Sequence, residues 1–482
     1  MFPATWYDGS GWSDAKYAAA SHVIISYAYQ GSKSAATFGT TAAFDDWADS
    51  QLLGTTWGKM KAGANKVSSG FEAFCVPTGP GTQVLVSFSW ATGGVKVAKA
   101  DAEAGSEPQG DATLDGAEFG VVNETGGYVL VGGKYYVNGE VCATMETKTV
   151  DGKHVAQTAS DALPVGKYSV VETGAPTGYR ANDKAAGFTV KAGEVTDLTG
   201  DPVDDEVIRG GVKVVKADKE LKASEALGGK DHSSTVGTNL NGIEFTVVNE
   251  SAAKVLVDGK WYEPGEAVLT MTTAWNEEAK AYTAQTASDA LPYGSYTVQE
   301  TATNGCYLLT DGEAKPFEVR EDGKIVDAST GGEALTFYDQ VVRNDLEVTK
   351  KADSSNESLQ VAFKVENVTT GEAHVLVTDR NGDASTAASW NKHSANTNGN
   401  DALLEAQGVI AAADMDAKVG IWFALGEDGS EAAVDDNLAA LPYGEYRLTE
   451  LSCEANQGLE LITKTFWVER DSTVAKLSLI HI

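Results

Sequence analysis

The sequence is poor in the residues that most often carry chemistry, with 4 cysteines and 6 histidines among 482 residues. The cysteines form no Cys-X-X-Cys pair, which argues against a zinc site and against a dithiol redox motif. The histidines show neither a metal-ligand spacing nor the pattern of a catalytic triad. We therefore predict no cofactor, no metal and no turnover enzyme. The cysteines are Cys75, Cys142, Cys306 and Cys453.

Basic residues are also scarce. The chain has 37 lysines and arginines and 69 aspartates and glutamates, which gives a net charge of −32. So negative a chain repels phosphates, which argues against nucleic acid as a partner and against adsorption on an anionic membrane. A well-solvated surface is the simplest interpretation of the charge. No apolar run is long enough to span a membrane, and the segment after Met1 does not resemble a secretion signal. We predict no membrane insertion, and an extracellular location has to be argued from other features.

Proline is sparse at 11 residues, but glycine is abundant at 51, and hydrophobic residues make up 42% of the chain. Segments rich in Val, Thr, Tyr and Phe alternate with period two and are broken by Gly, Asn and Asp. This pattern is typical of antiparallel β-sandwiches, whose short strands are joined by turns. The hydrophobic content is high enough to form cores, so we expect a folded, mainly β chain.

A long internal repeat sets the domain organisation. The string GGVKVAKAD begins at Gly93 and GGVKVVKAD at Gly210, and NDLEVTKKAD from Asn344 is a weaker third copy. Each copy continues into an apolar strand and then into a strand that starts with Leu-Pro-X-Gly-X-Tyr. Repeats of this size are whole domains, so we predict three tandem antiparallel β-sandwiches of the transthyretin or Ig type. The first, second and third sandwich are residues 93–209, 210–343 and 344–482.

Residues 1–92 differ from the repeats and hold five of the ten tryptophans. Two alanine-rich stretches favour helices, and two strand-like stretches flank a Pro-Gly turn. We predict a small, separate α+β head in this segment, in which Cys75 is a buried strand residue.

Alternation within the strands predicts which side chains face the core, because every second residue of a strand points to the same side. In the first strand of each repeat a lysine shares its face with two apolar residues, as Lys99 does with Val95 and Val97. By the same rule a glutamate faces the core in the Leu-Pro-X-Gly-X-Tyr strand, and an aspartate does so in the closing strand of the first two repeats. The predicted core-facing charges are Lys99, Glu172 and Asp205, then Lys216, Glu300 and Asp339, then Lys350 and Glu450.

Buried unpaired charges are costly, so these side chains need an explanation. One interpretation is that the strand ends are wet and carry ordinary rim charges or a surface salt bridge. The other is covalent. Burial favours the uncharged forms of an amine and a carboxyl, and a neutral amine can attack a carboxyl carbon while a second carboxyl relays protons. The product would be a side-chain amide bond, with the loss of one water. The pattern alone leaves both interpretations open.

The combined motifs resemble the collagen-adhesin B-type, or SpaA-like, domains of Gram-positive surface adhesins and pilins. The motifs are Lys-X-Asp, Leu-X-Gly-Ala-X-Phe and Leu-Pro-X-Gly-X-Tyr-X-X-X-Glu-Thr, and the resemblance covers residues 93–482. It implies transthyretin-like sandwiches, many of which form a spontaneous isopeptide bond between a lysine of the first strand and an Asn or Asp of the last, assisted by a glutamate.

Carried over by position, the resemblance implies an isopeptide bond in each of the first two sandwiches. The implied bonds are Lys99–Asp205, with Glu172 as proton shuttle, and Lys216–Asp339, with Glu300 as proton shuttle. Lys96 and Lys213 lie on the opposite face of the strand and are expected to stay free.

The third sandwich departs from the family pattern. It has Lys350 and a candidate shuttle in Glu450, but an extra residue disturbs its Lys-X-Asp spacing. The sequence ends in KLSLIHI without a recognisable acceptor strand, so we expect this sandwich to be incomplete at its C-terminal end and to lack the bond. Neither a wall-sorting motif of the LPXTG type nor a pilin-type YPK motif is present, so attachment to the cell wall is implied by the resemblance alone.

The head bears a fainter resemblance, in ASHVIISYAYQGS, to the thioester adhesin domains of similar surface proteins. Those domains cross-link a Cys to a Gln that follows it. Here Cys75 follows Gln30 and Gln51 and precedes only Gln83 within the segment. The order does not fit, unless the head is truncated at its start.

These features predict a structural stalk segment of an extracellular protein of the bacterial cell wall, which displays its head away from the cell. The alternative is an adhesin whose head or loops bind a host matrix protein or a glycan, because clustered aromatic residues suit such contacts. The only catalysis we expect is the single-turnover cross-linking of the chain to itself.

Overall fold

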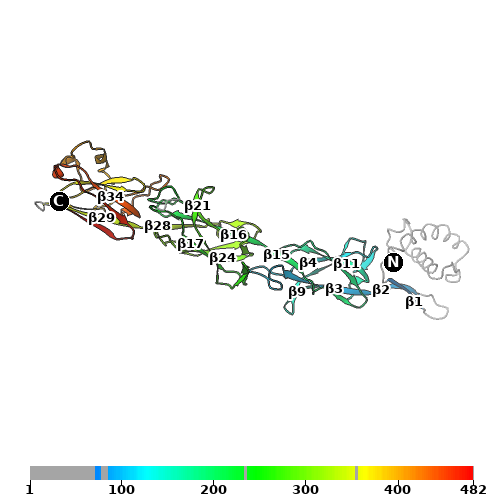
Figure 1. Cartoon of the computed structure of the whole chain (residues 1–482). Helices are drawn as coiled ribbons and strands as arrows, with labels where there is room; N and C mark the ends of the chain where they lie inside the picture. The colour runs from blue at the N-terminus through cyan, green and yellow to red at the C-terminus, as the bar shows by residue number, and fades with distance from the viewer. Residues whose placement is uncertain (1–70, 77–84, 233–235, 353–356, 481–482) are drawn as a thin grey trace, which may run out of the picture. The chain divides into compact units, whose positions relative to one another are not determined.

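Strands dominate the protein, as the sequence predicts. The structure is a computed structural model, and the residues that it describes are 71–76, 85–232, 236–352 and 357–480 (Figure 1). Within these ranges the helices are short 3-10 turns, and none is long and apolar enough to cross a bilayer.

The chain divides into two compact units. One unit comprises the residues up to Pro108 together with Ala112–Val207, and it contains the first sandwich. The other comprises Gln109–Asp111 and the residues from Ile208 onward, and it contains the second and third sandwiches.

A pair of strands is the described part of the predicted head. β1 (Phe71–Val76) pairs antiparallel with β2 (Leu85–Trp90). This is the strand pair expected around the Pro-Gly turn, and Cys75 lies in β1. The expected helices and the sequence that resembles a thioester domain lie outside the described residues.

The first sandwich has two sheets (Figure 1). One sheet has the strand order β12-β15-β3-β9-β8, with β10 and β14 also paired to β3, and the other has the order β13-β11-β4-β7. A separate hairpin joins β5 and β6. The strands are β3 (Thr92–Asp101), β4 (Glu118–Asn123), β5 (Val129–Val131), β6 (Lys134–Tyr136), β7 (Val141–Glu146), β8 (Lys148–Val150), β9 (Lys153–Gln157), β10 (Leu163–Pro164), β11 (Gly166–Gly174), β12 (Tyr179–Arg180), β13 (Ala186–Val190), β14 (Val195–Asp197) and β15 (Val203–Val207).

The second sandwich repeats this plan. Its sheets have the orders β21-β22-β16-β28-β25, with β23 and β27 paired to β16, and β20-β17-β24-β26. Its hairpin joins β18 and β19. The strands are β16 (Arg209–Asp218), β17 (Glu244–Asn249), β18 (Val255–Val257), β19 (Lys260–Tyr262), β20 (Ala267–Thr272), β21 (Ala274–Asn276), β22 (Ala281–Gln285), β23 (Leu291–Pro292), β24 (Gly294–Ala302), β25 (Tyr307–Leu308), β26 (Lys315–Val319), β27 (Ile325–Val326) and β28 (Thr336–Val341).

The third sandwich keeps the two-sheet plan but adds a long insertion. β32, β33 and β36 pair with β29, and the second sheet has the order β31-β30-β34-β35. Residues 386–440 join β32 to β33, whereas the corresponding join in the first sandwich, from β9 to β10, is residues 158–162. The elements are β29 (Arg343–Lys351), β30 (Ala362–Asn367), β31 (Ala373–Val377), β32 (Asp383–Ser385), η4 (Asp401–Glu405), η5 (Ala412–Asp414), β33 (Leu441–Pro442), β34 (Gly444–Glu450), η6 (Glu454–Asn456), β35 (Thr463–Val468) and β36 (Val474–Ile480).

The first and last strands of each sandwich pair in parallel, which an all-antiparallel prediction does not anticipate. β15 pairs with β3, β28 with β16, and β36 with β29. β14 and β27 also pair in parallel, with β3 and β16, and the remaining pairings of the described strands are antiparallel, as predicted. Because the first and last strands are neighbours in one sheet, side chains from the two ends of each sandwich meet in the same core.

The Leu-Pro-X-Gly-X-Tyr motif fixes the start of the glutamate strand. In each sandwich the tyrosine hydroxyl donates to the carbonyl oxygen of the proline four residues earlier, at 2.8 Å. A Cβ on Gly294 would clash with the Ser251 side chain, which explains the glycine. The glutamate lies four residues after the tyrosine and therefore on the same, core-facing side. The tyrosines are Tyr168, Tyr296 and Tyr446.

Candidate functional sites at buried lysines

The first site lies where β3, β11 and β15 meet inside the first sandwich. Parallel pairing sets Val203 opposite Lys99, so Asp205, two residues further along β15, points to the same side. Lys99 Nζ lies 2.5 Å from Asp205 Oδ1 and 3.7 Å from Glu172 Oε2, and none of the three side chains is exposed. The amine also donates to the carbonyl oxygen of Val203 at 3.1 Å. The structure thus brings together the three charged residues singled out in this repeat.

The second site has the same construction from β16, β24 and β28. Phe337 pairs with Lys216, and Asp339 follows two residues later. Lys216 Nζ lies 2.6 Å from Glu300 Oε2 and 3.0 Å from Asp339 Oδ2, with all three side chains fully buried. The alternative of wet strand ends does not hold for these two sites, because solvent reaches none of their charged side chains.

A fully buried phenylalanine lies opposite the glutamate in each sandwich. The pairs are Glu172 with Phe119, Glu300 with Phe245, and Glu450 with Phe363. Removal from water disfavours an ionised carboxyl. Burial raises the pKa of Glu172 to about 7. Burial, together with a hydrogen bond to Asp339, raises the pKa of Glu300 to about 8.

These pKa values decide the charge of each site. A glutamate with a raised pKa holds its proton at a pH where an exposed glutamate has lost it. A site with one lysine, one ionised carboxyl and one protonated carboxyl carries no net charge, which lowers the cost of burying it. The same set contains a nucleophile, an electrophilic carboxyl carbon and a proton carrier in mutual contact.

The third site has the lysine and the glutamate but no aspartate among the described residues. Lys350 Nζ lies 3.1 Å from Glu450 Oε2, and both side chains are fully buried. Burial lowers the pKa of Lys350, although Glu450 opposes the effect. Glu450 also accepts hydrogen bonds from Asn456 Nδ2 at 2.9 Å and from the Ile462 amide at 3.2 Å. These donors hold the glutamate in place beside the lysine.

The expectation of a missing acceptor strand in the third sandwich is wrong for the strand itself. β36 occupies the place of β15 and β28 and pairs with β29 along its length, with Leu479 opposite Lys350. By the register of the other two sandwiches, the acceptor position is two residues beyond Leu479, at position 481. The sequence has a histidine there, which cannot form an amide, and it lies outside the described residues.

The lysines of the opposite strand face are placed as predicted. Lys96 and Lys213 are both partly exposed. Lys213 forms a surface ion pair with Asp327, at 3.7 Å from Nζ to Oδ2. Such exposed pairs contribute little to stability, so these lysines belong to the solvated face.

Sequence reasoning missed a buried aspartate in each of the first two sandwiches. Asp101 and Asp218 end the Lys-X-Asp motif, and each accepts a hydrogen bond at 2.9 Å from a tyrosine hydroxyl. The donors, Tyr179 and Tyr307, begin β12 and β25, the strands that flank the closing strand. Burial raises the pKa of Asp218 to about 6. The signal was present in the sequence, because the Lys-X-Asp motif contains this aspartate and the motif recurs in the repeats.

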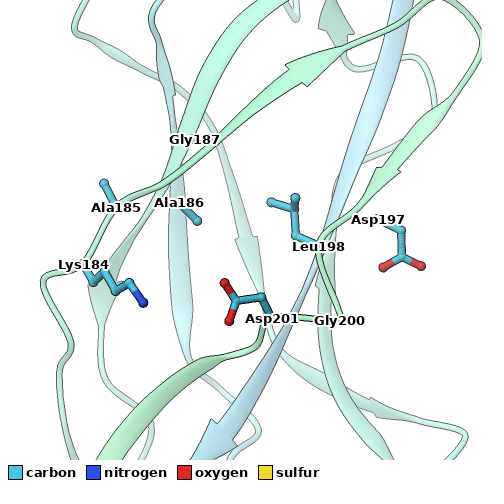
Figure 2. Close-up of a pocket in the computed structure, with 8 residues that line it drawn as sticks. All are labelled: Lys184, Ala185, Ala186, Gly187, Asp197, Leu198, Gly200 and Asp201. Atoms are coloured by element: carbon cyan, nitrogen blue, oxygen red, sulfur yellow. The ribbon is translucent and has the colours of Figure 1, made fainter.

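A hollow opens on the first sandwich beside β13 (Figure 2). In Figure 2 the amine of Lys184 and the carboxylate of Asp201 point toward each other across the opening. The lining residues are Lys184, Ala185, Ala186, Gly187, Asp197, Leu198, Gly200 and Asp201.

A single substitution between the repeats accounts for this hollow. Ala186 pairs with the residue two positions before Glu172, and Lys315 holds the same register position in the second sandwich. Lys315 Nζ donates to the carbonyl oxygen of Thr336 at 2.6 Å and lies over the Phe337 ring. The hollow therefore marks the place of a shorter side chain, and we assign it no ligand.

The described residues contain no group of His, Cys, Asp and Glu arranged to hold a metal ion. Within the same ranges Cys142, Cys306 and Cys453 are buried and free. The sites of interest are therefore the three lysine–carboxyl sites.

Comparison with solved structures finds similarity to bacterial pilins and to one further bacterial protein. The TIE protein of Bacillus anthracis is 19% identical, with a TM-score of 0.45, over 86% of this chain and 57% of that one. BcpA, the major pilin subunit of Bacillus cereus, is 12% identical, with a TM-score of 0.26, over 81% of this chain and 99% of that one. A streptococcal ancillary pilin is 15% identical, with a TM-score of 0.22 and the same coverage, 81% and 99%. The chain thus spans 57% of the length of the TIE protein. No curated protein matches the chain.

A family model described as the prealbumin-like fold domain SpaA matches the chain twice, at residues 93–202 and 226–333. The first match includes Lys99 and Glu172, and the second includes Glu300. Both matches end before the closing strand that carries the aspartate. Residues 93–202 and 226–333, which make up most of the first and second sandwiches, are thus similar to the prealbumin-like SpaA domain.

Proposed function

We propose that this chain is a structural stalk segment of a bacterial cell-surface protein whose first two sandwiches are closed by isopeptide bonds. The bonds join Lys99 to Asp205 and Lys216 to Asp339. The observation that carries the proposal is the contact of at most 3.0 Å between the amine and the aspartate inside a core that solvent does not reach. A salt bridge in that position has to offset the desolvation of two ions, whereas an amide bond removes both charges.

The reaction needs no group from outside the chain. The lysine ammonium transfers a proton to the aspartate, and the neutral Nζ attacks Cγ. The protonated glutamate then gives its proton to the departing oxygen, which leaves as water, and takes one back from the nitrogen. The Nζ–Cγ bond forms, one Cγ–O bond breaks, and the glutamate ends in its initial state. Glu172 and Glu300 are the proton shuttles, and each site reacts once.

The position of the bond suits a protein under mechanical load. It joins the first and last strands, so a pull on the two ends of a sandwich passes through a covalent link instead of a hydrogen-bonded ladder. By analogy with a disulfide, closing a loop of this size also restricts the unfolded chain, for a stabilisation of about 4–5 kcal/mol. A stalk needs this resistance and needs no substrate pocket.

The cell-surface location is supported by the similarity of the first two sandwiches to the SpaA domain, and attachment to the cell wall goes with it. Residues 1–92 would then be the head that the stalk displays. A second candidate function, adhesion to a host matrix protein or a glycan, is favoured by the five tryptophans of this segment. Binding of matrix proteins and glycans by the full chain, but not by a chain without residues 1–92, would support it.

Peptide mapping tests the proposed bonds directly. Protease digestion of the full chain should yield one peptide pair joined through Lys99 and Asp205 and another joined through Lys216 and Asp339. Glu300→Gln should abolish the second pair and leave the first, because it removes the proton carrier of one site only. Recovery of unmodified Lys216 and Asp339 peptides from the wild-type chain would contradict the proposal.

A further inference from the structure

The two carboxylate oxygens of Asp339 have different surroundings. Oδ2 faces the nucleophile, at 3.0 Å from Lys216 Nζ. Oδ1 accepts hydrogen bonds from two backbone amides, at 2.9 Å from Thr310 and at 3.2 Å from Asp311, and a longer one, at 3.4 Å, from the Thr310 hydroxyl. The lysine and the amide donors therefore act on different oxygens of one carboxyl group.

The segment that supplies these amides is held in place on both sides. It follows β25, which pairs with β28 through Leu308 and Gln340. The Asp311 carboxylate accepts from the Tyr338 amide at 3.0 Å and from Lys315 Nζ at 3.0 Å. The Thr310 hydroxyl accepts from the Gln340 amide at 3.2 Å. The two amides are thus fixed on Asp339 before any reaction starts.

We propose that the Thr310 and Asp311 amides form an oxyanion hole for the formation of the Lys216–Asp339 bond. The inference rests on the proposed function. When Nζ attacks Cγ, the electron pair of the Cγ–Oδ1 double bond moves to Oδ1, and the two amides stabilise that charge. The pair returns as the Cγ–Oδ2 bond breaks, and Oδ2 leaves as water with protons delivered through Glu300. Preorganised donors aimed at developing charge in a water-free site are among the largest contributions to catalysis.

In the first sandwich the backbone amide at the equivalent position donates to the glutamate and not to the aspartate. Asn182, like Thr310, lies three residues after the tyrosine that binds the Lys-X-Asp motif. Its amide donates to Glu172 Oε2 at 3.1 Å. Among the described residues, no backbone amide donates to the Asp205 carboxylate, whose side-chain partners are Lys99 and Glu172. The same molecule therefore contains one site with the proposed hole and one without it.

The test measures how fast each bond appears in the full chain. The chain is made by cell-free synthesis with a short isotopic pulse, quenched in acid after increasing times, digested, and analysed for both joined peptide pairs. Thr310→Pro and Asp311→Pro each delete one amide donor. Each should slow the Lys216–Asp339 bond about 100-fold or more, the cost of losing one oxyanion-hole donor. The Lys99–Asp205 bond of the same molecules is the internal reference and should keep its rate.

Matched controls place a proline in the same segment without deleting either amide. Glu313→Pro and Ala314→Pro do so at exposed positions, and both should form the bond at nearly the wild-type rate. Amide-deleting variants that form the bond as fast as these controls would overturn the oxyanion hole while leaving the bond itself in place. A wild-type chain that never joins Lys216 to Asp339 would instead overturn the proposed function.

If the proline variants do not fold, a measurement on the wild-type chain tests the oxyanion hole. Protection of the second sandwich from hydrogen exchange reports whether they fold. In the wild-type time course the second sandwich should form its bond at least about 10-fold faster than the first, because only its acceptor has the two donors. Equal rates, or a faster first sandwich, would overturn the inference.

Discussion

The second and third sandwiches bury the same lysine–glutamate pair and differ in what stands beside it. Lys216 contacts both Glu300 and Asp339, whereas Lys350 contacts Glu450 alone among the described carboxyl groups. In the second site burial and a hydrogen bond to the extra carboxyl raise the pKa of the glutamate, and in the proposed reaction this carboxyl supplies the carbon that is attacked. In the third site the glutamate is held by Asn456 and by the Ile462 amide.

The difference shows that the same arrangement of strands can accommodate a buried lysine in two ways. A third group turns the site from an ion pair into a reactive set, while two extra donors stabilise the ion pair as it is. The glutamate alone therefore does not identify a bond-forming site. In the proposed function the closing strand decides, through the residue two positions beyond the partner of the lysine.

Removal of the buried lysine of the second sandwich should have the largest effect, and a larger one than removal of a surface lysine. Lys216→Ala should leave the chain one water lighter instead of two. It should also destabilise the second sandwich by about 4–5 kcal/mol, the value of the lost loop closure. Intact mass and hydrogen exchange of the second sandwich measure the two effects. Lys213→Ala, on the opposite face of the same strand, is the control and should change neither the water loss nor the stability. An unaltered stability in Lys216→Ala would argue against a bond at this site.

Breaking the pair of the third sandwich should cost about 3–5 kcal/mol, because Glu450→Ala leaves a buried amine without a partner. The mass should change by the substitution alone. The double variant Lys350→Met, Glu450→Leu should recover most of the stability, since apolar residues can replace a buried ion pair. Denaturant unfolding, followed by exchange in the third sandwich, distinguishes these outcomes. A double variant as unstable as the single one would mean that the pair has a role beyond mutual neutralisation.

A smaller loss is expected at the tyrosine that binds the Lys-X-Asp motif. Tyr307→Phe removes the hydroxyl that donates to Asp218 Oδ2 and leaves a buried acceptor short of a donor. The second sandwich should lose about 1–3 kcal/mol and still form its bond. Tyr338→Phe, at a side chain that is 39% exposed, is the matched control and should have little effect. A complete loss of the joined peptides in Tyr307→Phe would place this tyrosine in the reaction and not beside it.

The pH dependence of bond formation should reflect the raised pKa of both glutamates. Each glutamate has a pKa above its unfolded value, so its proton is held at low pH and is lost as the pH rises through the folded value. The bond of the second sandwich should form more slowly above about pH 8, and that of the first above about pH 7. Rates of joined-peptide formation in the full chain, taken between about pH 5 and about pH 9, give both profiles. Rates that rise through this range in both sites would show that the glutamates act as ionised bases instead.

Much of the fold and of the lysine sites could be predicted from the alternation of apolar and polar residues and from the internal repeat. The faces of Lys99, Lys216 and Lys350 follow from the apolar residues two positions away, and their burial agrees with that assignment. The parallel pairing of first and last strands could not be read, because periodicity gives a face but no partner. The direction of the Thr310 and Asp311 amides was equally hidden, since any residue has the same backbone donor.

The third sandwich was the least predictable region. Its insertion, residues 386–440, has no repeat to align with and little regular structure. Trp422, a fully buried residue of this segment, shows that the insertion packs as part of the fold. The composition of a polar stretch does not reveal which of its few apolar side chains will be buried.

The intact mass of the full, denatured chain tests the central claim most directly. Two bonds remove two waters, so the account predicts a mass two waters below that calculated from the sequence. Glu172→Gln and Glu300→Gln should each restore one of them after correction for the substitution. A mass three waters low would erase the difference between the second and third sandwiches, and a mass equal to the calculated one would contradict the account.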